Sequence, residues 1–254
     1  MKDIIFTGSG VSIVTPFSNE SVNLMAMGDL LDFHLTNGTD AVIICDAAGE
    51  ASTMSYRERM RTLEFCINYL SGRIPVIAAA GSNSTEQAIQ LSRDAQTAGA
   101  DALLVVTPYC SKATQLGLIR HYSAVANLVK IPVLISNDPS RTGVTVAPET
   151  YAELARHPNI QGTVEISGDL DLIQRTRNLC PERFSIWSGR DDLTVPICAL
   201  GGKGVVSVAA NILPREMQRW YGCVWRTIST PRGCCSWSSR SSSTPWSARL
   251  APFR

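Results

Sequence analysis

The feature that most constrains this chain is a regular alternation between short apolar runs and longer amphipathic segments. The apolar runs recur about every 30 residues and are apolar on both faces, which is typical of parallel strands covered on both sides. We expect strands at residues 10–15, 41–45, 75–79, 102–106, 131–136, 160–164, 184–187 and 204–208.

Segments with apolar residues at helical spacing separate these runs. The sequence predicts helices at residues 24–37, 56–70, 84–98, 115–129, 148–156, 169–179 and 191–200, and an eighth that begins at Pro214. Eight strand–helix units predict an α/β fold of the (β/α)8 TIM-barrel type. A doubly wound open sheet is the alternative, but it usually has fewer strands, and the first turn lacks the GxGxxG pattern of that fold.

Composition excludes several classes of function. The net charge of +1 gives no electrostatic reason to expect nucleic acid as a partner. No apolar run reaches the roughly 20 residues that a membrane span needs, and the start of the chain has no signal-peptide pattern, so we expect a cytoplasmic protein. The eight cysteines form no CxxC pair, and the three histidines lie in predicted helices or just after one. We therefore expect no metal and no cofactor.

The sequence changes character near Trp220. Residues 221–254 contain five arginines, no lysine and no acidic residue, together with many serines. We see no helical or strand periodicity there, and Pro231 and Pro245 would break a helix. We therefore predict a barrel at residues 1–220 and an irregular tail at 221–254, either a basic arm or an out-of-frame terminus without an evolved role.

Several motifs resemble the dihydrodipicolinate synthase / N-acetylneuraminate lyase family of Schiff-base pyruvate lyases and aldolases. The resemblance runs from about Phe6 to Met217 and is closest to the synthase branch. The segments that carry it are residues 6–8, 14–17, 49–53, 72–77, 106–109, 139–143 and 201–208.

The resemblance implies condensation of pyruvate with aspartate semialdehyde, a step of lysine biosynthesis. It implies that Arg141 holds the carboxylate of the semialdehyde, a role that suits a planar guanidinium. Val206 and Gly189 are the other positions expected to contact substrate. Family members are commonly tetramers, so a homo-oligomer is possible. They also continue into a C-terminal helical domain, which the tail here would replace.

The expected catalytic positions depart from the family pattern. The lysine that forms the imine with pyruvate is replaced by Val164, which has no amine. A relay tyrosine at the end of the fifth strand is replaced by Ser136, and a second relay tyrosine by Cys110. The paired threonines that bind the pyruvate carboxylate fall on Ala47 and Ala48. Together these changes remove the nucleophile, the proton relay and the side chains that bind the pyruvate carboxylate.

Other groups are candidates to replace the missing amine. Lys112 follows the fourth strand and is the only lysine expected at the catalytic end of the barrel. Asp46 and Asp138 replace uncharged residues and add two carboxylates near a pocket that should bind anions. A carboxylate-only magnesium site is an alternative, and its ligands would come from Asp46, Glu50, Asp138, Glu165, Asp191 and Asp192.

Three hypotheses follow. The chain is a working Schiff-base lyase, a non-catalytic barrel of this family that binds a pyruvate-like acid or a partner protein, or an altered gene product without a selected function. The absence of an amine at Val164 argues against the first. We expect the family's fold with little or no synthase activity.

Overall fold

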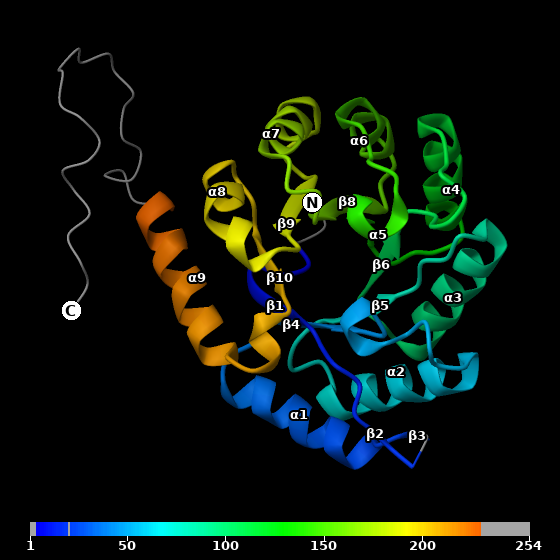
Figure 1. Cartoon of the computed structure of the whole chain (residues 1–254), viewed down its shortest axis with the longest axis vertical. Coiled ribbons are helices and arrows are strands. Elements are labelled where there is room, and N and C mark those ends of the chain that lie inside the picture. The colour runs from blue at the N-terminus through cyan, green and yellow to red at the C-terminus, as the bar shows by residue number, and fades with distance from the viewer. Residues whose placement is uncertain (1–3, 20, 230–254) are drawn as a thin grey trace.

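The computed structural model describes residues 4–19 and 21–229, in which eight parallel strands close into a barrel surrounded by helices (Figure 1). A short antiparallel hairpin, β2 with β3, follows the first barrel strand. The strands are β1 (Gly8–Ser12), β2 (Phe17–Ser18), β3 (Ser21–Val22), β4 (Ala41–Ile44), β5 (Val76–Ala79), β6 (Ala102–Val106), β7 (Val133–Asn137), β8 (Ile160–Glu165), β9 (Ser185–Ser188) and β10 (Gly204–Ser207).

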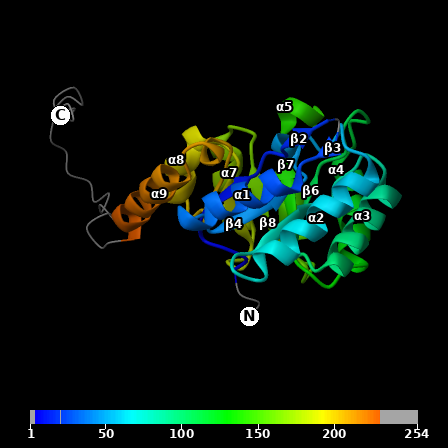
Figure 2. The same cartoon turned by 90° about the horizontal axis from the view of Figure 1, so that it is seen from below.

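The barrel strands pair in chain order from β4 to β10, and β1 lies between β4 and β10 and closes the ring. Every barrel pair is parallel, so the carboxyl ends of all eight strands meet at one end of the barrel. Helix α5 and the β2–β3 hairpin lie at the same end (Figure 2). The predicted (β/α)8 TIM barrel is confirmed.

The helices follow the predicted ranges closely. They are α1 (Leu24–Thr36), α2 (Tyr56–Leu70), α3 (Thr85–Ala98), α4 (Gln115–Asn127), α5 (Pro139–Thr142), α6 (Pro148–Leu154), α7 (Leu170–Leu179), α8 (Thr194–Ala199) and α9 (Pro214–Ser229). Side chains fix several starts. Ser55 and Glu58 form a capping box at α2, and the Ser84 hydroxyl accepts from the Gln87 amide at α3.

Alternation along each strand divides the core into two clusters. Side chains inside the barrel form the inner cluster, which contains Phe6, Leu104, Leu134, Val164, Trp187 and Val206 among others. Side chains on the opposite faces of the strands pack against the helices and form a larger outer cluster.

Two predicted elements differ in detail. The first strand spans Gly8–Ser12, whereas the sequence predicts residues 10–15. The predicted helix at 191–200 begins as a 3-10 turn, Asp191–Leu193, before α8 starts at Thr194. Thr194 continues the turn by donating its hydroxyl to the carbonyls of Arg190 and Asp191.

Helix α9 also extends beyond its predicted end. The sequence predicts irregular structure from Tyr221, but α9 continues to Ser229. Tyr221 is buried, donates its hydroxyl to the Lys203 carbonyl at 2.7 Å, and stacks on Trp225 one helical turn later. Met217, one turn earlier, packs on the outer cluster. The predicted lack of helical periodicity from Tyr221 is therefore wrong over residues 221–229, where α9 is amphipathic to its end. The rest of the predicted tail, residues 230–254, lies outside the described residues.

Within the described ranges, no helix is both long and apolar enough to cross a membrane.

Candidate functional site

A pocket of about 210 Å³ opens at the carboxyl end of the barrel strands. Its lining comes from the ends of β1, β4, β6, β7, β8, β9 and β10 and from the loops that follow them. The lining residues are Ser12, Asp46, Ala47, Ala48, Leu104, Val106, Ser136, Asp138, Arg141, Val164, Ile166, Gly189, Val206 and Val208. The carboxyl end is where α/β barrels place their ligands.

The pocket brings together most of the residues singled out in the sequence. Its lining includes Val164, Ser136, Ala47, Ala48, Arg141, Val206 and Gly189. Cys110 is not among them, because it lies exposed in the loop after β6, in a left-handed backbone conformation with φ of 68°. Their roles in binding or catalysis remain predictions.

Val164 lies at the inner wall of the pocket. Its side chain is 2% exposed and belongs to the inner cluster, with Ser136 of β7 and Trp187 of β9 as its neighbours in register. Gly189 approaches it closely: a Cβ at Gly189 would lie 3.0 Å from Val164 Cγ1. The position expected to carry the reactive amine is therefore filled by a packed apolar side chain.

No described lysine takes the place of that amine. Lys112 is exposed and lies over Gly143, where an added Cβ would be 3.3 Å from Lys112 Cε. It does not line the pocket. Lys130 and Lys203 precede β7 and β10 and so lie toward the opposite end of the barrel.

Arg141 is paired within its own loop. Short helix α5 places Arg141 three residues after Asp138, and Arg141 Nε lies 3.0 Å from Asp138 Oδ2. The second oxygen of Asp138 accepts from the Ser140 hydroxyl at 2.5 Å. The Asp138 side chain is 7% exposed, whereas that of Arg141 is 68% exposed. The guanidinium predicted to hold a substrate carboxylate therefore already faces a carboxylate of this chain.

Asp46 brings a second carboxylate to the pocket. It follows β4, and its Oδ2 accepts from the Ser12 hydroxyl of β1 at 2.8 Å. Asp46 precedes the 3-10 turn Ala47–Gly49, but its side chain does not cap that turn. Sequence reasoning gave Ser12 no role in the site. A polar residue within an apolar strand was the signal that could have identified it.

Glu165 lies on the other side of β8 from Val164 and is almost fully buried. It accepts hydrogen bonds from the Tyr151 hydroxyl, from Asn137 Nδ2 at 3.1 and 3.2 Å, and from the Ser167 hydroxyl at 2.9 Å. Burial raises the pKa of this carboxyl, and the hydrogen bonds oppose that rise. Asn137 also accepts from the Val146 amide, so the network ties β8 to the loop after α5.

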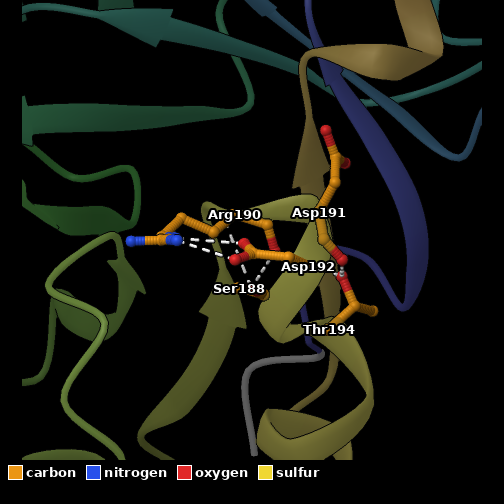
Figure 3. Close-up of polar contacts among 5 residues, drawn as sticks. All are labelled: Ser188, Arg190, Asp191, Asp192 and Thr194. Carbon is orange, nitrogen blue, oxygen red and sulfur yellow. Dashed lines mark hydrogen bonds and ion pairs between the residues drawn. The ribbon is translucent and has the colours of Figure 1, made fainter.

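A second acidic turn follows β9 (Figure 3). Arg190 bonds to both oxygens of Asp192, at 3.0 and 2.7 Å, and this ion pair is exposed. Asp191 turns away from the pair, and its Oδ2 accepts from the Ala209 amide at 3.1 Å. Its other oxygen is buried without a hydrogen-bond partner among the described residues. None of these three residues lines the pocket.

The magnesium alternative gains no support from this arrangement. In the part of the chain that the structure describes, no group of three or more histidine, cysteine, aspartate or glutamate side chains is placed to hold a metal ion. Asp46 and Asp138 line the pocket, Glu165 lies behind β8, and Asp191 and Asp192 lie in the turn after β9. Glu50 is exposed at the end of the 3-10 turn that follows β4.

Comparison with curated proteins gives a consistent set of relatives. The chain is 49% identical over 214 residues to a 4-hydroxy-tetrahydrodipicolinate synthase of Thermoanaerobacter sp. (strain X514), a match that covers 84% of this chain and 72% of the relative. It is 48% identical over 213 residues to the Geobacter sulfurreducens protein of the same name, covering 84% and 73%.

Solved structures give the same result. Dihydrodipicolinate synthase from Aquifex aeolicus superposes with a TM-score of 0.86 at 42% identity, covering 88% of this chain and 76% of that one. A chloride-inhibited dihydrodipicolinate synthase from Acinetobacter baumannii, solved in complex with pyruvate, has a TM-score of 0.85 at 36% identity, covering 89% and 78%. The model of the dihydrodipicolinate synthetase family matches residues 5–225. With its barrel, its motifs and these similarities in agreement, the chain belongs to the dihydrodipicolinate synthetase family.

Proposed function

We propose that this chain is a member of the family that keeps a ligand pocket at the carboxyl end of its barrel but does not condense pyruvate through an imine. One observation carries the proposal: the position expected to supply the amine is Val164, packed into the pocket wall.

The chemistry explains why one side chain decides so much. An imine forms when a primary amine attacks the ketone carbon of pyruvate and the carbonyl oxygen leaves as water. When the imine is protonated, the resulting iminium ion draws electrons from the adjacent methyl carbon. That carbon can then lose a proton and attack an aldehyde. A valine methyl group has no lone pair with which to begin this sequence. Loss of a covalent nucleophile alone can cost on the order of a millionfold in rate.

The neighbouring positions do not supply a substitute. Ser136, Ala47 and Ala48 line the pocket where the resemblance predicts a tyrosine and two threonines, and Cys110 lies outside it. The hydroxyls of Ser12 and Ser136 are the neutral hydroxyl groups in the lining. Neither can form an imine, and a serine hydroxyl is a far weaker acid than a phenol.

Borohydride trapping tests the proposal directly. The purified full chain is incubated with pyruvate and sodium borohydride, which reduces an imine to a stable amine, and its intact mass is measured. We expect no pyruvate-sized adduct on this chain. The G. sulfurreducens relative serves as the positive control, and its modification would show that the trapping conditions work.

Two variants make the test sharper. Val164→Lys restores an amine at the pocket wall, and we expect it to gain the adduct. Lys112→Arg is the matched control, because Lys112 is the exposed lysine nearest to the catalytic end. Its intact mass should be the same before and after incubation with pyruvate and borohydride. An adduct on the unmodified chain would contradict the proposal, and its loss in Lys112→Arg would show that the reaction had moved to Lys112.

A further inference from the structure

The lining of the pocket carries more negative than positive charge. Asp46 and Asp138 contribute two carboxylates and Arg141 one guanidinium, a formal charge of −1. A pocket that binds a carboxylic acid usually presents unpaired donors or cations to it. The lining of this pocket instead carries a net negative charge.

Arg141 does not offer the ligand a free positive charge, because Asp138 already neutralises it. Their contact is 3.0 Å, and Ser140 holds the remaining oxygen of Asp138. A ligand carboxylate that approached Arg141 would lie beside a buried carboxylate. Like charges at such separations repel, more strongly where water is partly excluded.

Asp46 is the carboxylate left without a cation. Its described partner is the Ser12 hydroxyl, and none of the ion pairs among the described residues includes it. It does not cap the turn that follows it, so a helix cap does not account for its presence. It is half-buried and faces a cavity with apolar walls, which include Leu104, Val106 and Val206.

We propose that this pocket binds a small organic cation, with an ammonium group at Asp46 and an apolar body against the wall that contains Val164. The inference rests on the proposed function, because a chain that forms no imine must hold its ligand without a covalent bond. A volume of about 210 Å³ suits a ligand with few carbon atoms. Charge then decides which small ligand is accepted: alkylammonium ions are favoured, and the pyruvate-like acids expected from the resemblance are disfavoured.

Three probes of equal chain length test this preference: n-butylammonium, 1-butanol and butyrate. Dissociation constants are measured by NMR titration of the full chain at pH 7 and constant ionic strength. We expect n-butylammonium to bind at least about tenfold more tightly than butyrate, with butanol between them, since a hydrogen bond to a charged group is commonly worth about a factor of ten or more. Added salt should weaken n-butylammonium binding and leave butanol unaffected.

Variants identify the groups responsible. Asp46→Asn should weaken n-butylammonium binding at least about fivefold and leave butanol unchanged. Asp192→Asn is the matched control, because it removes a carboxylate that does not line the pocket, and it should change none of the three constants. Asp138→Asn frees Arg141 and should strengthen butyrate binding. Circular dichroism and thermal unfolding verify that each variant is folded.

Butyrate binding as tightly as n-butylammonium would overturn the inference, as would failure of all three probes to bind. An Asp46→Asn variant that is folded and binds n-butylammonium normally would also overturn it. The salt dependence of the unmodified chain gives an independent answer should that variant fail to fold. An imine adduct in the borohydride experiment would overturn the proposed function instead, so the two failures have different readouts.

Discussion

The two faces of strand β8 make an instructive contrast. On the inner face, Val164 fills the position where the family resemblance predicts a reactive amine. On the outer face, Thr163 and Glu165 lie in a complete hydrogen-bond network with Tyr151, Asn137 and Ser167. The polar side chains of the outer face are hydrogen-bonded to one another, whereas the inner-face position expected to carry the amine holds a packed valine.

Mutations on the outer face of β8 should lower the stability of the fold most. Glu165→Ala removes the acceptor for Asn137 Nδ2, which stays buried, and one of two partners of the Tyr151 hydroxyl, which keeps Thr163 Oγ1 at 3.1 Å. An unsatisfied buried donor costs about 1–3 kcal/mol, and the deleted side-chain atoms leave a cavity that adds to this cost, so we expect the free energy of unfolding to fall by about 3 kcal/mol. Urea titration measures the change. Ser167→Ala, which removes only one donor from a half-buried position, is the control and should cost about 1 kcal/mol. Equal losses in both variants would show that Glu165 does not organise the network.

The inner face should respond through packing alone. Val164→Ala removes methyl groups from a side chain that is 2% exposed, and we expect a loss of about 2 kcal/mol from reduced burial and the cavity left behind. Val208→Ala, at a side chain that is 55% exposed on the rim of the same pocket, is the control and should change stability little. A neutral Val164→Ala would mean that the inner face is loosely packed there and that the contrast between the faces is weaker than proposed.

The smallest expected change in stability, expressed per pH unit, comes from the titration of Glu165. Its pKa is raised from the usual 4.5 by burial, so the unfolded chain releases this proton at lower pH than the folded chain does. The stability contributed by the protonated form is fully present below pH 4.5 and is lost as the pH rises through the folded pKa. One proton limits the change to about 1.4 kcal/mol per pH unit.

Comparison with Glu165→Gln isolates this contribution, because glutamine does not titrate. Unfolding free energies of the two proteins, measured from pH 4 upward, should diverge, with the unmodified chain losing stability relative to the variant. The tyrosines near this carboxylate, Tyr151 and Tyr122, stay neutral over that range, since burial raises the pKa of each well above 10.0. If the unfolding free energies of the two proteins changed in parallel with pH, Glu165 would titrate alike in the folded and the unfolded chain.

Much of the fold could be predicted from local pattern. The helix at residues 56–70 has the predicted bounds, and Ser84 caps α3 as expected. The main error concerns α9, whose amphipathic pattern continues past Tyr221 to Ser229. Tyr221 continues α9 because its hydroxyl reaches Lys203 and its ring packs on Trp225, whereas the serine- and arginine-rich composition favoured an irregular end.

The candidate site divides in the same way. Residues at strand ends could be assigned to one end of the barrel, because parallel strands all place their carboxyl ends there. Cys110 could not be excluded from the pocket by that rule, because the direction of a loop depends on its backbone conformation. Ser12 was missed because its partner, Asp46, is distant in sequence and meets it only when β1 pairs with β4.

The local pattern specifies the alternation that builds the barrel and the chemical identity of each side chain, including the absence of an amine at Val164. The folded arrangement shows that Asp138 neutralises Arg141, that Asp46 faces the pocket without a cation, and that Glu165 is buried among donors. These two kinds of information differ in the sequence separation of the residues involved. Periodicity is a property of neighbouring residues, whereas the charge of a pocket depends on which strand ends converge and which partners their side chains find there.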